Sequence, residues 1–303
     1  MPDGAAAGGG EKARLAAFLG ERKRLLRLAY RYLGSVSEAE DAVQDAWLRF
    51  AAADAPEHSG RYLSRIVTNL CLDRLKSARA RRERYVGPWL PEPLVGAAGA
   101  VEAEAGDAAL DVSFAVMRAL ERLSPLERAA LFLHDLYELS FEEVGETLKR
   151  SPAACRQMAS RARRSLKDGG ARFQPSEADV ARFVAGFAET ARTGDLGPLK
   201  TLLAADVDFV SDGGGKVSAA LNVVSGADKV ARFLLGLARK RTAGMDVAAV
   251  PAAINGGPGL IVHVGGRLDH TMAFSVDGAG AISAIYVVRN PDKLRAVAAQ
   301  GGA

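Results

Sequence analysis

Three closely spaced helix-start signals constrain the fold of this chain more than any other feature of its sequence. Each signal is a serine, which can cap a helix, followed by proline at the first helical position or by glutamate three residues later. The signals are Ser124-Pro125 with Glu127, Ser140 with Glu143, and Ser151-Pro152. They predict three short helices in succession, over about 125–136, 141–149 and 152–167.

The last two of these helices are separated by so short a turn that the sequence predicts a helix-turn-helix. The final helix is expected to bury a stripe that repeats every four residues, Ala154, Met158, Ala162 and Leu166. Its expected DNA-contacting residues are Arg156, Gln157, Ser160, Arg163 and Arg164, with Arg161 at the edge of that face. Arginine and glutamine can read base edges, and residues 149–167 hold seven basic side chains and no acidic one. The alternative is a plain helical hairpin with a solvated basic face.

The first 84 residues are also predicted to be helical. Apolar residues recur at helical spacing over 12–33, and a third helix is expected over 59–84. Between them, Ser37 with Glu40 predicts a capping box that starts a helix ending near residue 53. The sequence therefore predicts an all-α domain over residues 11–84.

The third of these helices is basic, with eight basic and two acidic side chains over residues 61–84. On it, Asn69, Asp73 and Lys76 share one face, flanked by Arg65 and Arg79. A basic helix that carries a small amide can bind single-stranded DNA and hold an unstacked base. The alternative is that these charges only solvate a long helix.

Residues 85–111 are predicted to be a linker, because prolines and glycines interrupt the helical pattern. One apolar island, Trp89-Leu90, lies among the prolines. Residues 92–111 hold five acidic side chains and no basic one, so an acidic segment separates two basic ones. This order favours two footprints on a polyanion, joined by a segment that avoids it. Fully extended, 27 residues span about 90 Å.

From Ser176 onward the pattern changes to short helices and strands. The expected helices cover 177–192, 197–204 and 225–240, and the expected strands cover 207–210, 246–254, 259–275 (broken at Gly265-Gly266) and 280–288. Asp277-Gly278 predicts a hairpin turn. Helices followed by an antiparallel sheet favour an α+β domain.

Composition excludes several other classes of protein. A hydrophobic fraction of 49% and a charged fraction of 25% are those of a globular protein. Two cysteines exclude a disulfide scaffold and a cysteine-rich zinc site. The first ten residues lack the features of a signal peptide, and the longest uncharged stretch is too rich in glycine and proline to span a membrane. We therefore expect a cytoplasmic protein without cofactor or metal. The net charge of +4 alone does not identify a nucleic-acid partner.

Three segments together resemble the extracytoplasmic-function sigma factors of bacteria. Residues 37–50 resemble the helix of that family that binds RNA polymerase, 65–76 resemble its helix for the −10 promoter element, and 123–164 resemble its region four, which reads the −35 element. The resemblance implies two all-α sigma domains, at 11–84 and 112–170, with core RNA polymerase and promoter DNA as partners. It also assigns the polymerase contact to one stripe, Asp41, Gln44, Asp45 and Leu48. Such a protein is not an enzyme.

The linker and the C-terminal part carry three more motifs, at residues 89–93, 212–216 and 290–294. They resemble the sigma-factor group with a fused SnoaL-like domain, here expected at 176–299, which is thought to control the sigma core in cis. The expected regulatory contacts are Trp89, Leu90, Glu92, Asp212, Lys216, Asn290, Asp292 and Lys293. We expect the linker to dock near the Asp212–Lys216 turn, with Glu92 paired to Lys216.

A different function remains open for the C-terminal domain. SnoaL-like folds include cyclases and isomerases that use aspartate and histidine as acid and base. The candidates here are Asp212, His263, Asp269 and His270, whose spacing is not diagnostic, so no catalytic role is assigned. The alternative to a sigma factor is thus a DNA-tethered enzyme or ligand sensor, with a small ligand in the domain's cavity.

Overall fold

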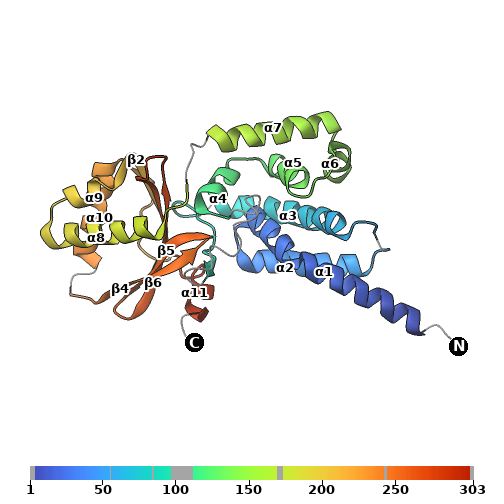
Figure 1. Cartoon of the computed structure of the whole chain (residues 1–303), viewed down its shortest axis with the longest axis horizontal. Coiled ribbons are helices and arrows are strands. Elements are labelled where there is room, and N and C mark those ends of the chain that lie inside the picture. The colour runs from blue at the N-terminus through green and yellow to red at the C-terminus, as the bar shows by residue number, and fades with distance from the viewer. Residues whose placement is uncertain are drawn as a thin grey trace. The chain divides into compact units, whose positions relative to one another are not determined.

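The computed structural model describes residues 4–54, 56–83, 85–96, 112–168, 173–241 and 244–300 (Figure 1). The side chains of residues 4–10, 77–83, 168, 241 and 300 are outside this description. The chain divides into two compact units. The first consists of residues 1–83, 107–112 and 117–169, and the second of 84–106, 113–116 and 170–303.

The first unit begins with three packed helices, α1 (Gly4–Leu33), α2 (Val36–Ala51) and α3 (Ser59–Glu83). Their contact is apolar, and Leu25, Leu28, Leu63 and Val67 are fully buried. The expected capping box at Ser37 is wrong by two residues. Ser35 is the N-cap, because its backbone is extended (φ −126°, ψ 132°) and its side chain accepts from the Glu38 amide.

Four further helices belong to the region of the three serine signals: α4 (Phe114–Glu121), α5 (Pro125–Asp135), α6 (Phe141–Leu148) and α7 (Pro152–Asp168). Ser124 and Ser140 each form the predicted capping box with the glutamate three residues later. The Ser151 hydroxyl accepts from the Ala154 amide at 3.2 Å. The three helix starts are therefore confirmed.

The second unit is built on a seven-stranded sheet with the order β1-β4-β5-β6-β7-β2-β3. Its strands are β1 (Val95–Gly96), β2 (Leu203–Asp212), β3 (Val224–Ser225), β4 (Val247–Ile254), β5 (Gly257–Val264), β6 (Arg267–Val276) and β7 (Ile282–Val288). The sheet is mixed, because β2 runs parallel to β7 while the other pairs are antiparallel. The predicted α+β class is confirmed, and the expectation of a purely antiparallel sheet is wrong.

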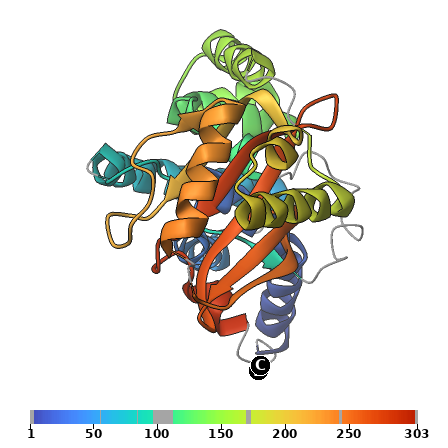
Figure 2. The same ribbon diagram turned by 90° about the vertical axis from the view of Figure 1, so that its left-hand side faces the viewer.

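The helices α8 (Glu177–Thr193) and α10 (Ala227–Arg241) cover one face of this sheet, as Figure 2 shows, with the short α9 (Gly197–Lys200) after α8. Phe183 of α8 packs against Phe274 of β6, with ring centroids 4.9 Å apart. The expected short helix over 197–204 ends early, because Leu203 and Ala204 already belong to β2. The core on this face is filled by side chains of the helices and the strands.

The other face of the sheet is covered by segments from elsewhere in the chain. Leu90 of the linker, Phe114 of α4 and Leu294, just before α11 (Arg295–Gln300), are buried there in one apolar cluster. Phe114 stacks on Tyr286 of β7 with centroids 5.5 Å apart. Strand β1 also comes from the linker and pairs with the end of β4. Part of the predicted linker is thus an integral part of this unit, while residues 97–111 lie outside the described residues.

Candidate DNA- and polymerase-binding surfaces and the linker site

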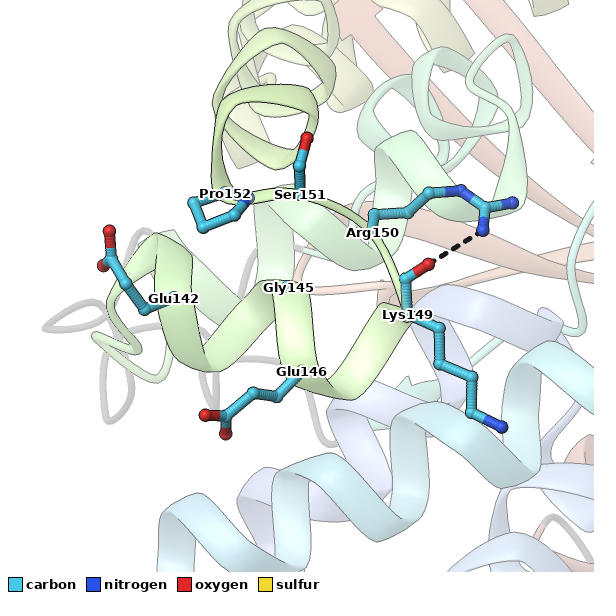
Figure 3. A pocket seen from close by; sticks show the side chains of 7 residues that line it. All are labelled: Glu142, Gly145, Glu146, Lys149, Arg150, Ser151 and Pro152. Atoms are coloured by element: carbon cyan, nitrogen blue, oxygen red, sulfur yellow. Dashed lines mark hydrogen bonds between the residues drawn. The ribbon is translucent and has the colours of Figure 1, made fainter.

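The turn between α6 and α7 is tight enough to require glycine at Gly145. A Cβ atom there would lie 2.6 Å from the carbonyl oxygen of Arg150. Lys149 ends α6 in the left-handed conformation (φ 54°), and the Arg150 amide donates to Gly145. An open hollow of about 530 Å³ lies beside this turn. Figure 3 shows the residues that line it, which come from α6, the turn and Pro152 at the start of α7. The predicted helix-turn-helix is therefore present.

Helix α7 is amphipathic, with its buried and exposed residues on different faces. Cys155, Met158, Ala159 and Ala162 are buried. Of the predicted DNA-contacting residues, Arg163 is half-buried and the others are exposed, namely Arg156, Gln157, Ser160, Arg161 and Arg164. The exposed polar set lies on the face opposite the buried one, so it is available to a ligand.

The arginines of α7 differ in their partners. Arg163 binds Asp135 of α5 with two nitrogens, and its Nε lies 2.9 Å from Oδ2. Arg161 lies 3.3 Å from Glu127. The guanidinium of Arg156 lies over the ring of Phe141 instead, 5.1 Å from its centroid. Arg163 therefore helps to fasten α7 to α5, a role that the sequence did not indicate.

Helix α3 presents most of its predicted DNA-binding face to solvent. Asn69, Asp73 and Lys76 are exposed, and Lys76 pairs with Asp73 at 2.8 Å. Arg79 lies on α3, but its side chain is outside the described part of the chain. Apart from Arg65, the described residues of this face are therefore accessible to a nucleic acid.

Arg65 is occupied by the helix-turn-helix. Its Nη2 donates to Oε1 of Glu143 at 3.0 Å, and its Nη1 lies 3.9 Å from Glu146. The pKa of Glu143 is lowered, first by the Ser140 amide that it caps and also by Arg65. The two segments that the sequence predicts to bind DNA therefore contact each other inside the first unit.

A buried arginine joins α5 to α1 and α4 in the same unit. Arg128 of α5 is 4% exposed and donates to the carbonyl oxygens of Tyr32 and Leu120, both at 2.8 Å. Tyr32 itself is fully buried and meets Phe132 edge to face, with centroids 5.1 Å apart. The bond to Tyr32 satisfies a carbonyl at the end of α1, and the bond to Leu120 reaches the last turn of α4.

The predicted polymerase stripe lies on α2. Asp41, Gln44 and Leu48 are exposed, and Leu48 retains 62% of its accessible surface. Asp45 differs, because its carboxylate accepts from Arg74 of α3 at 2.7 Å. Three of the four residues are thus free to meet a partner, and the fourth also stabilises the packing of α2 on α3.

Asp212 is the centre of the linker site in the second unit. Its side chain is fully buried and accepts from the Leu90 amide at 2.8 Å, the Tyr85 hydroxyl at 2.6 Å and the Gly214 amide at 3.0 Å. Lys293, 9% exposed, pairs with it at 2.7 Å. Burial and the neighbouring Asp212 raise the pKa of Tyr85. Asp212 therefore does more than cap the glycine turn.

The sheet explains why these distant residues meet. Because β2 and β7 are parallel neighbours, Asp212 at the end of β2 lies opposite Val288 at the end of β7. The chain that leaves β7 thus begins beside Asp212, whose carbonyl oxygen accepts from Arg289 and Asn290 at 2.7 and 2.9 Å. One turn later Lys293 lies 4.2 Å from the centroid of Trp89.

The glycine turn after Asp212 makes room for the linker. At Gly214 (φ 59°) a Cβ would lie 2.2 Å from Nδ2 of Asn290, which donates to the Tyr85 hydroxyl at 2.8 Å. The expected pair of Glu92 with Lys216 is wrong, because Lys216 pairs with Asp292. Lys216 follows Asp212 in the glycine turn and Asp292 directly precedes Lys293, so the pair closes the turn onto the chain that follows β7.

A second polar cluster joins β6 to the chain after β7. Asp269 lies 2.7 Å from Nδ1 of His270 and 2.6 Å from Nη2 of Arg289, and Arg289 also donates to the Ser218 carbonyl. These two partners hold the pKa of Asp269 well below its ordinary range. His263 lies on β5, opposite Ala248 of β4 and Leu268 of β6. Of the four candidates for acid–base chemistry, Asp212 and Asp269 are therefore engaged in ion pairs with basic residues, and His270 lies against Asp269.

The described residues contain no group of three or more histidine, cysteine, aspartate or glutamate side chains placed to hold a metal ion. None of their helices is both long and apolar enough to cross a membrane.

Both helical regions match known protein families. Residues 18–81 match the family model "Sigma-70 region 2" and residues 113–166 match "Sigma-70, region 4". The chain is 40% identical to the ECF RNA polymerase sigma factor SigJ of Mycobacterium tuberculosis over 90% of each chain. It is 30% identical to the probable ECF RNA polymerase sigma factor SigI of the same species over 95% of this chain and 97% of that one.

The agreement extends to a solved structure. The crystal structure of M. tuberculosis SigJ matches with a TM-score of 0.73 and 35% identity, covering 92% of this chain and 98% of that one. The match includes the helical regions and the sheet unit in the same order, as the sequence predicted. The chain belongs to the extracytoplasmic-function family of RNA polymerase sigma factors.

Proposed function

We propose that the C-terminal SnoaL-like domain controls this sigma factor in cis by holding the linker. The sigma activity itself, directing core RNA polymerase to promoter DNA, belongs to the two helical regions. The observation that carries the proposal is the buried Asp212–Lys293 pair. Asp212 accepts a hydrogen bond from the Leu90 amide, and Lys293 donates one to the Leu90 carbonyl oxygen.

The chemistry of this pair makes linker binding specific. A charge that is buried without a partner costs several kcal/mol, so Asp212 and Lys293 need every hydrogen bond that they make. The linker supplies part of that set through the Leu90 amide and carbonyl and the Tyr85 hydroxyl. Leu90 adds a fully buried side chain, worth about 1.5–3 kcal/mol. Removal of the linker from this site would therefore leave Asp212 and Lys293 without part of their hydrogen bonds.

In the sequence, the segments that form the linker site directly adjoin both sigma regions. Region two ends with α3 at Glu83, and Tyr85 already belongs to the Asp212 network. Region four begins with α4, whose Phe114 is buried with Leu90 in the apolar cluster on the sheet. A domain that binds both segments restricts the arrangements in which the two DNA-reading regions can be presented.

For the SnoaL-like domain itself we propose a regulatory role without turnover. The sigma-factor family is not enzymatic, and Asp269 and Asp212 are both neutralised by basic partners. A general base needs a free acceptor within reach of a substrate. A transcription assay with core polymerase, beside a search for turnover without polymerase, separates this role from that of a DNA-tethered enzyme.

The experiment that tests control in cis compares two lysine variants in promoter-dependent transcription with core polymerase. Lys293→Met removes the buried cation, and Lys200→Met, which removes a half-exposed lysine that pairs with Asp228 outside the linker site, is the matched control. We expect K293M to raise transcription at equal protein concentration and K200M to leave it nearly unchanged. If K293M remains folded by circular dichroism and transcribes like the wild type, the linker site has no regulatory role.

A further inference from the structure

The arginines of the recognition helix α7 fall into two groups by what holds them. Arg161 and Arg163 lie against carboxylates, so much of their charge is satisfied within the domain. Arg156 and Arg164 have no acidic partner among the residues that the structure describes, and both are exposed. The guanidinium of Arg156 lies over Phe141, the first residue of α6.

Phe141 is in turn fixed by His134. The two rings are stacked with their centroids 4.0 Å apart and their planes 21° apart. Nδ1 of His134 lies 2.8 Å from the carbonyl oxygen of Leu139. A carbonyl oxygen only accepts, so Nδ1 carries the proton and the imidazole is anchored to the backbone of the α5–α6 loop. A series of contacts therefore runs from this loop through two rings to Arg156.

This support suits an arginine that reads a base. A guanidinium over an aromatic face gains cation–π attraction while its N–H groups at the edge remain free to donate. A long side chain that is already oriented loses less conformational entropy when it binds. The partner that two parallel N–H donors fit is the O6 and N7 pair of a guanine in the major groove.

We propose that Phe141, held by His134, is a positioning residue for Arg156 and thereby sets the preference for guanine at one position of the −35 element. This inference rests on the proposed reading of DNA by α7, and it adds which arginine discriminates and what orients it. Phe141 acts through Arg156 and does not itself contact the base.

The test uses the full chain with core polymerase on a promoter that the wild type selects from a pool with randomised −35 sequences. The readout is the ratio of transcription from that promoter to transcription from each single-base variant. We expect Arg156→Ala to reduce the ratio at one guanine position by about 10-fold or more. Phe141→Leu should reduce the ratio at the same position by about threefold, and Phe141→Tyr, which keeps the ring, should retain it.

The double variant separates positioning from folding. In the R156A background, F141L should change the ratio no further, because its effect passes through the arginine. If R156A changes no position, the assignment of Arg156 to base reading fails. If R156A acts but F141L does not, or if F141L weakens all positions equally in both backgrounds, the positioning role is wrong while the reading role of Arg156 stands.

Discussion

Arg65 of α3 donates to Glu143 of α6 across 3.0 Å, which joins the helix predicted to bind the −10 element to the helix-turn-helix predicted to bind the −35 element. Promoter elements of the family lie two helical turns apart, about 70 Å. A side-chain pair cannot persist while its two helices occupy sites so far apart. If α3 and the helix-turn-helix bind these elements as predicted, this contact has to open before both elements are bound, and Arg65 becomes available only then.

Weakening this pair should favour promoter binding. Glu143→Gln keeps a side chain that can complete the capping box but removes the charge that Arg65 meets. Both side chains are about one-third exposed, so the pair is worth at most about 1 kcal/mol. We expect the affinity of the full chain for promoter DNA to rise by about twofold to fivefold at fixed salt.

The neighbouring glutamate provides the control for this prediction. Glu142 is exposed and lies in the first turn of the same helix. Glu142→Gln removes the same charge from α6 without touching Arg65. Equal affinities of E142Q and E143Q would mean that the Arg65 contact does not restrain DNA binding.

Replacing arginines of α7 should weaken recognition of the −35 element unequally. Arg156→Ala is expected to cost about 1–3 kcal/mol if the guanidinium makes a bidentate base contact. Arg161→Ala should cost less, because Arg161 already lies against Glu127 and its side chain is 63% exposed. Quantitative binding to promoter and scrambled DNA measures both. Unchanged binding in both variants contradicts the assignment of α7.

Charge reversal on α2 should remove polymerase binding without unfolding the protein. Asp41 is exposed and has no ion pair among the described residues, so Asp41→Lys is expected to abolish capture of core polymerase at an unchanged melting temperature. Asp45→Lys should lose binding and also lower the melting temperature, because it breaks the pair with Arg74. A pull-down that remains undiminished for D41K would mean that the stripe is only a solvated face.

Two truncations should have opposite effects on transcription. Deletion from residue 289 removes Lys293 and Asn290, and with them the restraint on the linker, so activity should rise. Deletion from residue 176 removes the whole surface that organises Leu90 and Phe114, so activity should fall. A reporter assay at matched protein levels measures both. Equal activity of all three forms leaves the domain without a role in cis.

The Asp269 cluster predicts a pH-dependent contribution to stability. The folded pKa of Asp269 is lowered, first by His270 and then by Arg289, so its contribution is present above the unfolded value of about 4 and is lost as the pH falls towards the folded one. Asp269→Asn should lower the melting temperature at pH 7 and lose that deficit below about pH 4. Asp206→Asn, at an exposed position of β2, is the control and should show neither effect.

Local signals in the sequence were sufficient for the helical regions. The capping boxes at Ser124 and Ser140 depend only on side chains within one turn, so spacing alone predicts them. Ser35 and Ser37 both precede a glutamate at a suitable distance, and only the extended backbone of Ser35 decides between them. Helix starts can therefore be predicted from the sequence, except where two neighbouring residues compete for the N-cap position.

Contacts between segments that are distant in the sequence were harder to predict. A two-residue strand such as Val95–Gly96 has no detectable periodicity, and it exists because β4 offers it partners. The parallel pairing of β2 with β7 decides that Lys216 meets Asp292, and nothing in the spacing of the motifs distinguishes that pair from one with Glu92. The motifs identified which residues gather, while the sheet topology determined their pairs.

The contacts around Asp212 also form at a particular stage of protein synthesis. Lys293 reaches Leu90 across 203 positions of sequence. Synthesis proceeds from the N-terminus, and contacts between such distant residues form late in folding. Both helical regions thus exist before the residue that secures the linker is made. Under the proposed control in cis, each molecule therefore acquires its restraint only after the regions that it restrains have been synthesised.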